Sequence, residues 1–266
     1  MWLKLFPKPQ EFDEMMFSNT IKNMSEYGIV LVKNERLNIY ARCRENEIQN
    51  FTSIEGVTGT KIDGKPDTMF DKARTFRLRK HYVFPLTVLP QKINLYNMLI
   101  DLPNFTFGIF CKTIDARRVS SPAIRFVQTR SITTMSTGMT RSSTKKWNPY
   151  LDEIKEKAKS PKIFISRIFF ACAGMDEEII KSAINFTVKG GEPNSLISSW
   201  RKKKMAEILM STPKIPFFSS KSCILSNIEA ESILALPTDT RTLQVEPGRD
   251  RTYANVLFEQ NTESKE

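Results

Sequence analysis

A glycine- and lysine-rich stretch near residue 60 has the spacing of a phosphate-binding loop. Gly59 to Lys65 reads GTKIDGK and matches the first seven positions of the P-loop motif, in which backbone N–H groups and a lysine surround nucleotide phosphates. The eighth position requires Ser or Thr for Mg²⁺, but here it is Pro66, which has no backbone N–H. We therefore interpret residues 58–68 as a Gly/Asp/Pro-rich turn region and assign no nucleotide site to it.

Histidine, cysteine and acidic residues do not form a catalytic or metal-binding pattern. His81 is the sole histidine, and the four cysteines are far apart, with no CxxC pair. Metal sites and histidine-dependent triads both need such residues at characteristic spacings. The acidic groups at 13–14, 152–153 and 176–178 fit solvated helix faces or first turns. The sequence predicts a protein without catalytic residues, cofactor or bound metal.

Two clusters of basic residues are the strongest surface signals in the chain. The protein carries 40 Lys and Arg against 29 Asp and Glu, which gives a net charge of +11. Such an excess suits a polyanion such as nucleic acid, while docking to an acidic protein partner, or simple solubility, is the alternative. The candidate nucleic-acid contacts are Arg74, Arg77, Arg79, Lys80, Arg201, Lys202, Lys203 and Lys204.

Two aromatic strands offer a second way to contact RNA. Residues 162–170 read KIFISRIFF and residues 105–113 read FTFGIFCKT. In RNA-recognition folds, aromatic side chains on two central strands stack on bases. Here the two motifs occur in reversed order, and alternating Phe in a strand is more often core. Base stacking by Phe107, Phe110 and Phe164 is therefore the minority interpretation.

The elements that would position these residues follow a β-α-β-β-α-β order at the N-terminus. This is the order of the split βαβ, ferredoxin-like unit. Apolar periodicity, turn residues and a helix-ending Gly28 define the elements. We predict strands over 2–6, 28–33, 37–41 and 51–57, and helices over 11–27 and 45–49.

The rest of the chain predicts a second, more elaborate unit. We predict strands over 83–89, 105–114 and 163–173, and helices over 93–102, 148–159, 176–186, 195–210 and 227–236. A Ser/Thr-rich loop lies near 129–147. The predicted fold class is α+β, with one or two ferredoxin-like units that have antiparallel sheets and helices packed on one face. The first unit, with its basic connector, spans 1–84, the second spans 85–237, and 238–266 form an extended tail.

Composition and cysteine placement predict a soluble intracellular protein. The chain is 40% hydrophobic and 26% charged, as is ordinary for a globular protein. No apolar run reaches the ~20 residues that a membrane span needs, and Arg167 interrupts the best candidate. Cys111 and Cys172 lie in apolar runs, as reduced core thiols do. We expect the protein in the cytoplasm or at the periphery of a membrane.

The C-terminal part of the chain resembles part of a known family. Residues 160–186 read SPKIFISRIFFACAGMDEEIIKSAINF, and after a basic segment residues 223–237 read CILSNIEAESILALP. This layout resembles the non-motor N-terminal domain of conjugation and type IV secretion ATPases and of HerA-like DNA translocases. The residues that carry the closing pattern are Ile224, Leu225, Ser226, Glu229, Glu231, Leu234, Leu236 and Pro237.

The resemblance implies a docking role in a DNA-translocation or secretion machine. In the family a P-loop motor follows this region, whereas the 266 residues contain neither a Walker A nor a Walker B motif, so ATP hydrolysis is not carried over. The implied partner is a motor ATPase or a membrane-channel component, with DNA or RNA as a further ligand, and the oligomeric state stays open. The alternative is a stand-alone RNA- or single-stranded-DNA-binding protein that uses the basic clusters and the strand aromatics.

Overall fold

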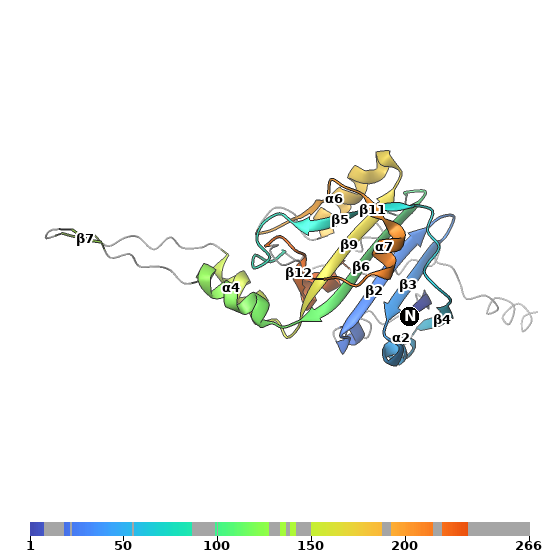
Figure 1. The fold of residues 1–266 in the computed structure, drawn as a ribbon, viewed down its shortest axis with the longest axis horizontal. Helices are drawn as coiled ribbons and strands as arrows, with labels where there is room; N and C mark the ends of the chain where they lie inside the picture. The colour runs from blue at the N-terminus through green and yellow to red at the C-terminus, as the bar shows by residue number, and fades with distance from the viewer. Residues whose placement is uncertain are drawn as a thin grey trace, which may run out of the picture.

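The described part of the protein consists of strands and short helices (Figure 1). A computed structural model describes residues 1–7, 19–21, 23–54, 56–86, 99, 101–127, 134–136, 139–141, 150–187, 193–214 and 220–233. The strands are β1 (Trp2–Pro7), β2 (Glu26–Lys33), β3 (Leu37–Cys43), β4 (Val57–Ile62), β5 (Lys72–Leu78), β6 (Phe105–Ile114), β7 (Thr134–Ser136), β8 (Met139–Arg141), β9 (Ile163–Cys172), β10 (Leu196–Ser198), β11 (Lys203–Lys204) and β12 (Ile224–Ser226). The helices are η1 (Glu45–Glu47), α2 (Ile48–Thr52), α4 (Arg117–Val127), α5 (Leu151–Ala158), η2 (Gly174–Asp176), α6 (Glu177–Thr187), α7 (Met205–Met210) and α8 (Asn227–Ile233).

One antiparallel sheet of ten strands organises the molecule. Its strand order is β10-β5-β9-β6-β2-β3-β1-β4, with β11 also paired to β5 and β12 to β9. The protein is therefore α+β with an antiparallel sheet, as predicted. Because β2 pairs with β6 from Glu26 to Lys33, the predicted units 1–84 and 85–237 contribute to the same sheet. Strands β7 and β8 pair only with each other among the described strands.

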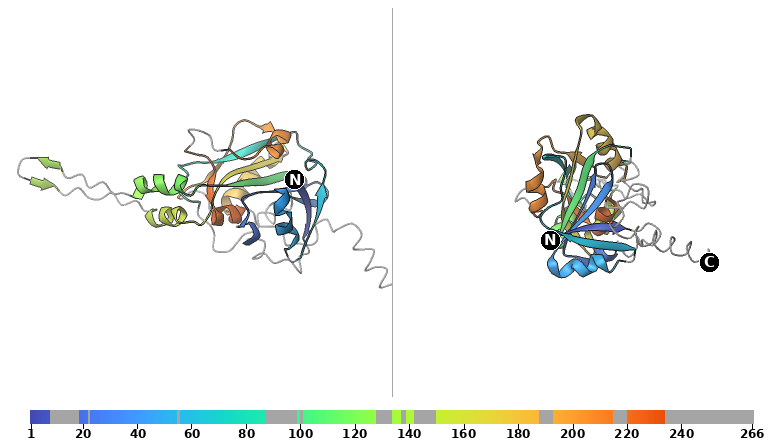
Figure 2. Two further views of the ribbon diagram at one scale, coloured as in Figure 1. Left: turned by 60° about the horizontal axis from the view of Figure 1, so that its bottom comes forward. Right: turned by 90° about the vertical axis from the view of Figure 1, so that its right-hand side faces the viewer.

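The central strands are buried on both faces, which explains their nearly continuous apolar sequences. On one face, α2, α6 and α8 supply Phe51, Ile180 and Ala230 to the larger core. On the opposite face, the short helix α7 supplies Met205 and Ile208 to a smaller core (Figure 2). The prediction that the helices pack on one face is therefore wrong, because both faces of the central strands are apolar and each needs a cover. No helix among the described residues is long and apolar enough to cross a membrane.

Glycine in two central strands makes room for aromatic rings on the α7 face. A Cβ added at Gly28 would lie closer than 3.0 Å to the Phe110 ring, and one added at Gly108 would do the same against Phe169. The two rings are 5.4 Å apart between centroids. Gly28 lies inside β2, so the prediction that it ends a helix is wrong. A glycine is needed here because the Phe110 ring takes up the space of a side chain.

Several predicted elements are confirmed. The strands predicted over 2–6, 28–33, 37–41, 105–114 and 163–173 correspond to β1, β2, β3, β6 and β9. The helices predicted over 45–49, 148–159 and 176–186 correspond to η1 with α2, to α5 and to α6, and α8 lies within the predicted 227–236.

Three predicted elements are wrong. The predicted strand 51–57 is replaced by the end of α2, followed by β4, because Phe51 enters the core from a helix and Gly56 turns the chain at a φ of 72°. The described part of the predicted strand 83–89 is a turn, with one bridge from Leu86 to Asn194. The predicted helix 195–210 is strand β10, a turn, β11 and then α7, because β5 offers backbone partners along that edge.

Other predictions fall mostly on residues outside the described part of the chain. These are the helices over 11–27 and 93–102, the loop near 129–147 and the tail 238–266. Of the first helix, Glu26 and Tyr27 belong to β2 instead. Of the P-loop-like stretch, Gly59 and Lys61 lie in β4, which pairs with β1 along its length.

Candidate functional site

The sheet places the two basic clusters side by side, although they are far apart in the sequence. Strand β5 carries Arg74 and Arg77 of the first cluster and ends just before Arg79 and Lys80. It pairs with β10, which precedes the second cluster, and with β11, which contains Lys203 and Lys204 and lies beside β5 in Figure 1. Lys72 lies opposite Lys204, and Ala73 lies opposite Lys203. We call the exposed cations along this border the basic edge, which consists of Lys72, Arg77, Arg79, Arg201, Lys203 and Lys204.

The cations of the basic edge form no ion pair with the described part of the protein. Like charges directly opposite each other on paired strands are destabilising, yet Lys72 and Lys204 occupy such positions. No salt bridge among the described residues involves any member of the basic edge. An external anion would relieve this repulsion. The sequence analysis did not select Lys72, although it begins the first cluster.

Two of the predicted nucleic-acid contacts, Arg74 and Lys202, instead form ion pairs with a nearly buried glutamate. Glu177, at the start of α6, is 8% exposed and accepts from Arg74 Nε at 2.7 Å and from Lys202 Nζ at 2.8 Å. Burial alone would raise the pKa of this carboxyl, but the bonds and charges of Lys202 and Arg74 outweigh burial and hold the pKa below its ordinary value. These two cations therefore already have an ion-pair partner within the protein.

Arg74 also holds the turn between β10 and β11. Arg74 Nη1 donates to the carbonyl oxygens of Ser199, at 3.1 Å, and Trp200, at 2.7 Å. The Ser199 hydroxyl accepts from the Thr75 N–H at 3.1 Å and donates to the Arg201 carbonyl at 3.0 Å. The backbone of the turn is thus held, while the Trp200 side chain is 93% exposed. The sequence analysis missed Trp200, although it directly precedes the basic run in WRKKK.

Lys80 and Arg79 continue the cluster beyond the end of β5. The Lys80 ammonium lies 5.6 Å from the centroid of the Tyr150 ring, a cation–π contact, and the Lys80 backbone N–H donates to Asn194 Oδ1 at 2.8 Å. The Arg79 backbone N–H donates to the Ser195 carbonyl at 2.8 Å, and Arg79 is exposed. Of the predicted contacts, Arg77, Arg79, Arg201, Lys203 and Lys204 are available to an external anion.

A groove extends the basic edge toward the turn after β4. Its volume is about 600 Å³, and Lys65, Lys72 and Lys204 contribute to its walls together with Phe70 and Met205. Asp67 and Asp71 also line it, so the groove carries one more positive than negative charge. The predicted turn region thus contributes Lys65 to a cationic groove, although it does not form a P-loop.

Two arginines of the sheet hold the C-terminal end of α7. Arg42 donates to the carbonyl oxygens of Leu209, Met210 and Ser211, and Arg167 to those of Ile208, Ser211 and Thr212. Cations at a helix C-terminus oppose the negative end of its dipole. Burial lowers the pKa of both guanidinium groups.

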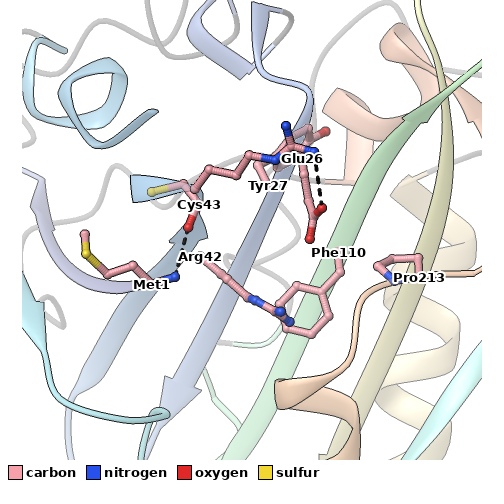
Figure 3. A pocket seen from close by; sticks show the side chains of 8 residues that line it. Met1, Glu26, Tyr27, Arg42, Cys43, Phe110 and Pro213 are labelled. Atoms are coloured by element: carbon pink, nitrogen blue, oxygen red, sulfur yellow. Dashed lines mark hydrogen bonds and ion pairs between the residues drawn. The ribbon is translucent and has the colours of Figure 1, made fainter. Parts of the chain in front are cut away.

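A second pocket, of about 180 Å³, lies beside Arg42 (Figure 3). The Arg42 guanidinium lies 5.5 Å from the centroid of the Phe110 ring, and the Met1 ammonium donates to the Cys43 carbonyl at 3.0 Å. Arg44 and Glu26 form an ion pair at 3.9 Å on its rim. Since these charges all have partners within the protein, we assign the pocket a structural role.

The aromatic residues proposed for base stacking are core residues. Phe107, Phe110 and Phe164 are at most 2% exposed, so none of them can reach a base in this structure. The free cysteines Cys43, Cys111, Cys172 and Cys223 are likewise all buried, as predicted for the second and third of them. The described residues contain no group of three or more His, Cys, Asp or Glu side chains placed to hold a metal ion.

The pattern that carries the family resemblance has a local structural explanation. Ser226 and Glu229 form a capping box at the start of α8: the Ser226 N–H donates to Glu229 Oε2 at 2.6 Å, and the Glu229 N–H donates to Ser226 Oγ at 3.3 Å. Glu229 is also paired with Lys157 at 3.0 Å, and both side chains are buried. These two pattern residues therefore stabilise the start of α8.

Comparison with known proteins adds no relative: no family model matches the chain, and no curated protein is significantly similar to it.

Proposed function

We propose that this protein binds nucleic acid along the basic edge, with the phosphate backbone as the main contact. The observation that carries the proposal is the register of β5 with β11, which aligns cations from two distant segments and leaves Lys72 and Lys204 opposite each other, with no salt bridge to either among the described residues. Seven residues of β5 span ~23 Å at ~3.3 Å per residue, enough to present charge to several successive phosphates. A phosphate chain would neutralise the repulsion and release its own counter-ions.

We further propose that the protein is the non-catalytic docking domain of a DNA-translocation or type IV secretion-like machine. The resemblance of residues 160–237 supports this role, and DNA binding at the basic edge is compatible with it. The order β4-β1-β3-β2, with every pair antiparallel, supports a split βαβ, ferredoxin-like unit in the first part of the sheet. Pull-down from native cells is expected to recover a motor ATPase or a channel component, and recovery of neither contradicts the docking role.

Nucleic-acid binding is tested by fluorescence anisotropy with labelled single- and double-stranded DNA and RNA across a salt series. If the six cations of the basic edge contact single-stranded phosphates, the slope of log Kobs against log salt is expected to be about −4, since each contact contributes roughly −0.7. The double substitution Lys203→Gln, Lys204→Gln is expected to weaken binding and to reduce the slope by about 1.4.

A matched control separates the basic edge from net charge alone. Lys61, in β4 at the other border of the sheet, and Lys159, just after α5, are also exposed lysines. The control Lys61→Gln, Lys159→Gln removes the same charge and is expected to leave the slope unchanged. Absence of binding at low salt, or equal loss in both double variants, would refute the proposed function.

A further inference from the structure

We propose that Trp200 stacks on an unpaired base, so that the preferred ligand of the basic edge is single-stranded nucleic acid. This inference rests on the proposed function and specifies its ligand class. It begins from the exposure of the indole, since Trp200 is 93% exposed and has almost no contact with the described part of the protein. Trp2, by comparison, is 5% exposed and packs on the Phe110 ring. An indole that contributes nothing to the core is available for an external contact.

The protein fixes the backbone beneath this indole. Arg74 donates to the Trp200 carbonyl oxygen at 2.7 Å, and Glu177 in turn accepts from Arg74 at 2.7 Å. The hydroxyl of Ser199, the residue before Trp200, accepts hydrogen bonds from the backbone N–H and the hydroxyl of Thr75 in β5. A nearly buried carboxylate is therefore engaged in holding a turn whose central side chain points into solvent. This arrangement presents the ring while restricting the turn, which lowers the entropic cost of a stacking contact.

The charges around Trp200 match the chemistry of a nucleic-acid strand. Arg201 follows it directly, and Lys203 and Lys204 lie in β11 with Lys72 opposite. Proteins that bind single strands combine a cationic track for the backbone with aromatic rings for the bases. In a duplex both faces of each internal base are already stacked on neighbours. The ring can therefore reach only unpaired or terminal bases, which makes single strands the favoured ligand.

An anionic membrane surface is the other ligand that an exposed tryptophan beside lysines could suit. Met175, two residues before Glu177, is also exposed, at 87%. Peripheral membrane binding by such a segment, however, depends on an apolar face that enters the lipid boundary. The described turn has one indole among cations aligned along strands, and this linear arrangement favours a phosphate chain. Vesicle binding is therefore an outcome of the test that would overturn the inference.

The test compares Trp200→Ala and Trp200→Phe with the native chain, using anisotropy on a single-stranded oligonucleotide and on its duplex. Trp200→Ala is expected to weaken single-strand binding by roughly five- to a hundredfold, since one stacked base contributes that much. Trp200→Phe keeps a ring and is expected to retain most of the affinity. Duplex binding and the salt slope are expected to stay unchanged in both variants, because the indole carries no charge.

Intrinsic fluorescence gives a second readout of the same contact. The single-stranded ligand is expected to quench native fluorescence, and Trp200→Phe is expected to lose this quenching while still binding. If Trp200→Ala binds single strands as tightly as the native chain while Lys203→Gln, Lys204→Gln binds weakly, stacking is refuted and the proposed function stands. If no nucleic acid binds, both are refuted, and Trp200-dependent binding to vesicles of phosphatidylserine and phosphatidylcholine would reassign the turn to a membrane.

Discussion

The substitution Gly28→Ala is expected to destabilise the fold, although alanine normally stabilises a strand relative to glycine by ~0.5–1 kcal/mol. The reason is the Phe110 ring, which lies where the new Cβ would go. Phe110 is 2% exposed, with the Trp2 ring centroid at 5.9 Å and the Phe169 ring centroid at 5.4 Å. Because the ring cannot move away into solvent, we expect an overpacking cost of about 2 kcal/mol, within the usual ~1–3 kcal/mol for such insertions.

Gly59 provides the matched control, because it also lies in a strand of the same sheet. A Cβ there would meet its nearest neighbour, Leu5 Cδ2, at 3.4 Å, which is an ordinary contact. We expect Gly59→Ala to be neutral or stabilising by up to ~1 kcal/mol. Urea denaturation followed by far-ultraviolet circular dichroism measures both variants.

A double variant tests whether the ring is the cause. In Gly28→Ala, Phe110→Leu the smaller side chain should leave room for the new methyl group. The combined loss of stability is therefore expected to be smaller than the sum of the two single losses, since the two positions are in contact. Equal stability of Gly28→Ala and Gly59→Ala, or strict additivity in the double variant, would refute the reasoning.

Three further predictions concern the buried polar groups. Glu177→Gln is expected to lower the free energy of unfolding above pH 4.5, because the pKa of the Glu177 carboxyl is lower in the folded than in the unfolded protein. This contribution is lost as the pH falls through the folded-state pKa, and below that pKa the variant should be as stable as the native chain. Denaturation at several pH values measures the difference in stability. Lys157→Met should cost ~3–5 kcal/mol in urea denaturation, since it leaves Glu229 buried without a cation, and Lys157→Met, Glu229→Gln should cost less; an equal loss would contradict this. Burial raises the pKa of each cysteine thiol to about 11 or 12, so Ellman's reagent at pH 8 is expected to titrate the thiols only after unfolding; fast native reaction would contradict their burial.

The sequence alone predicts the central strands well, because burial on both faces leaves a clear signal. Strands β6 and β9 are long apolar runs, and their predicted bounds agree with the structure to within one residue. The exposed members of the basic clusters are also predictable, since consecutive cations cannot all enter a core. For these residues, composition and local pattern are sufficient.

The structure of the basic edge could not be predicted from local pattern. Residues 195–210 have the composition of a helix, but the open side of β5 supplies hydrogen-bond partners that local periodicity does not reveal. The engagement of Arg74 with Glu177 joins positions that are distant in the sequence. Trp200 has a signal, its place before the basic run, but only the structure shows that its backbone is held and its ring exposed.

The pairing partners of β5 have a consequence for how the protein is made. Strands β1 to β4 pair among themselves, so they can associate while the rest of the chain is still on the ribosome. Strand β5 pairs only with β9, β10 and β11 among the described strands, all of which are synthesised later. Arg42 likewise can make its hydrogen bonds only after the synthesis of carbonyl acceptors that lie 167 to 169 residues further along the chain. The basic edge is therefore completed late in synthesis, and a nascent chain that has not reached α7 lacks the surface that we propose for nucleic acid.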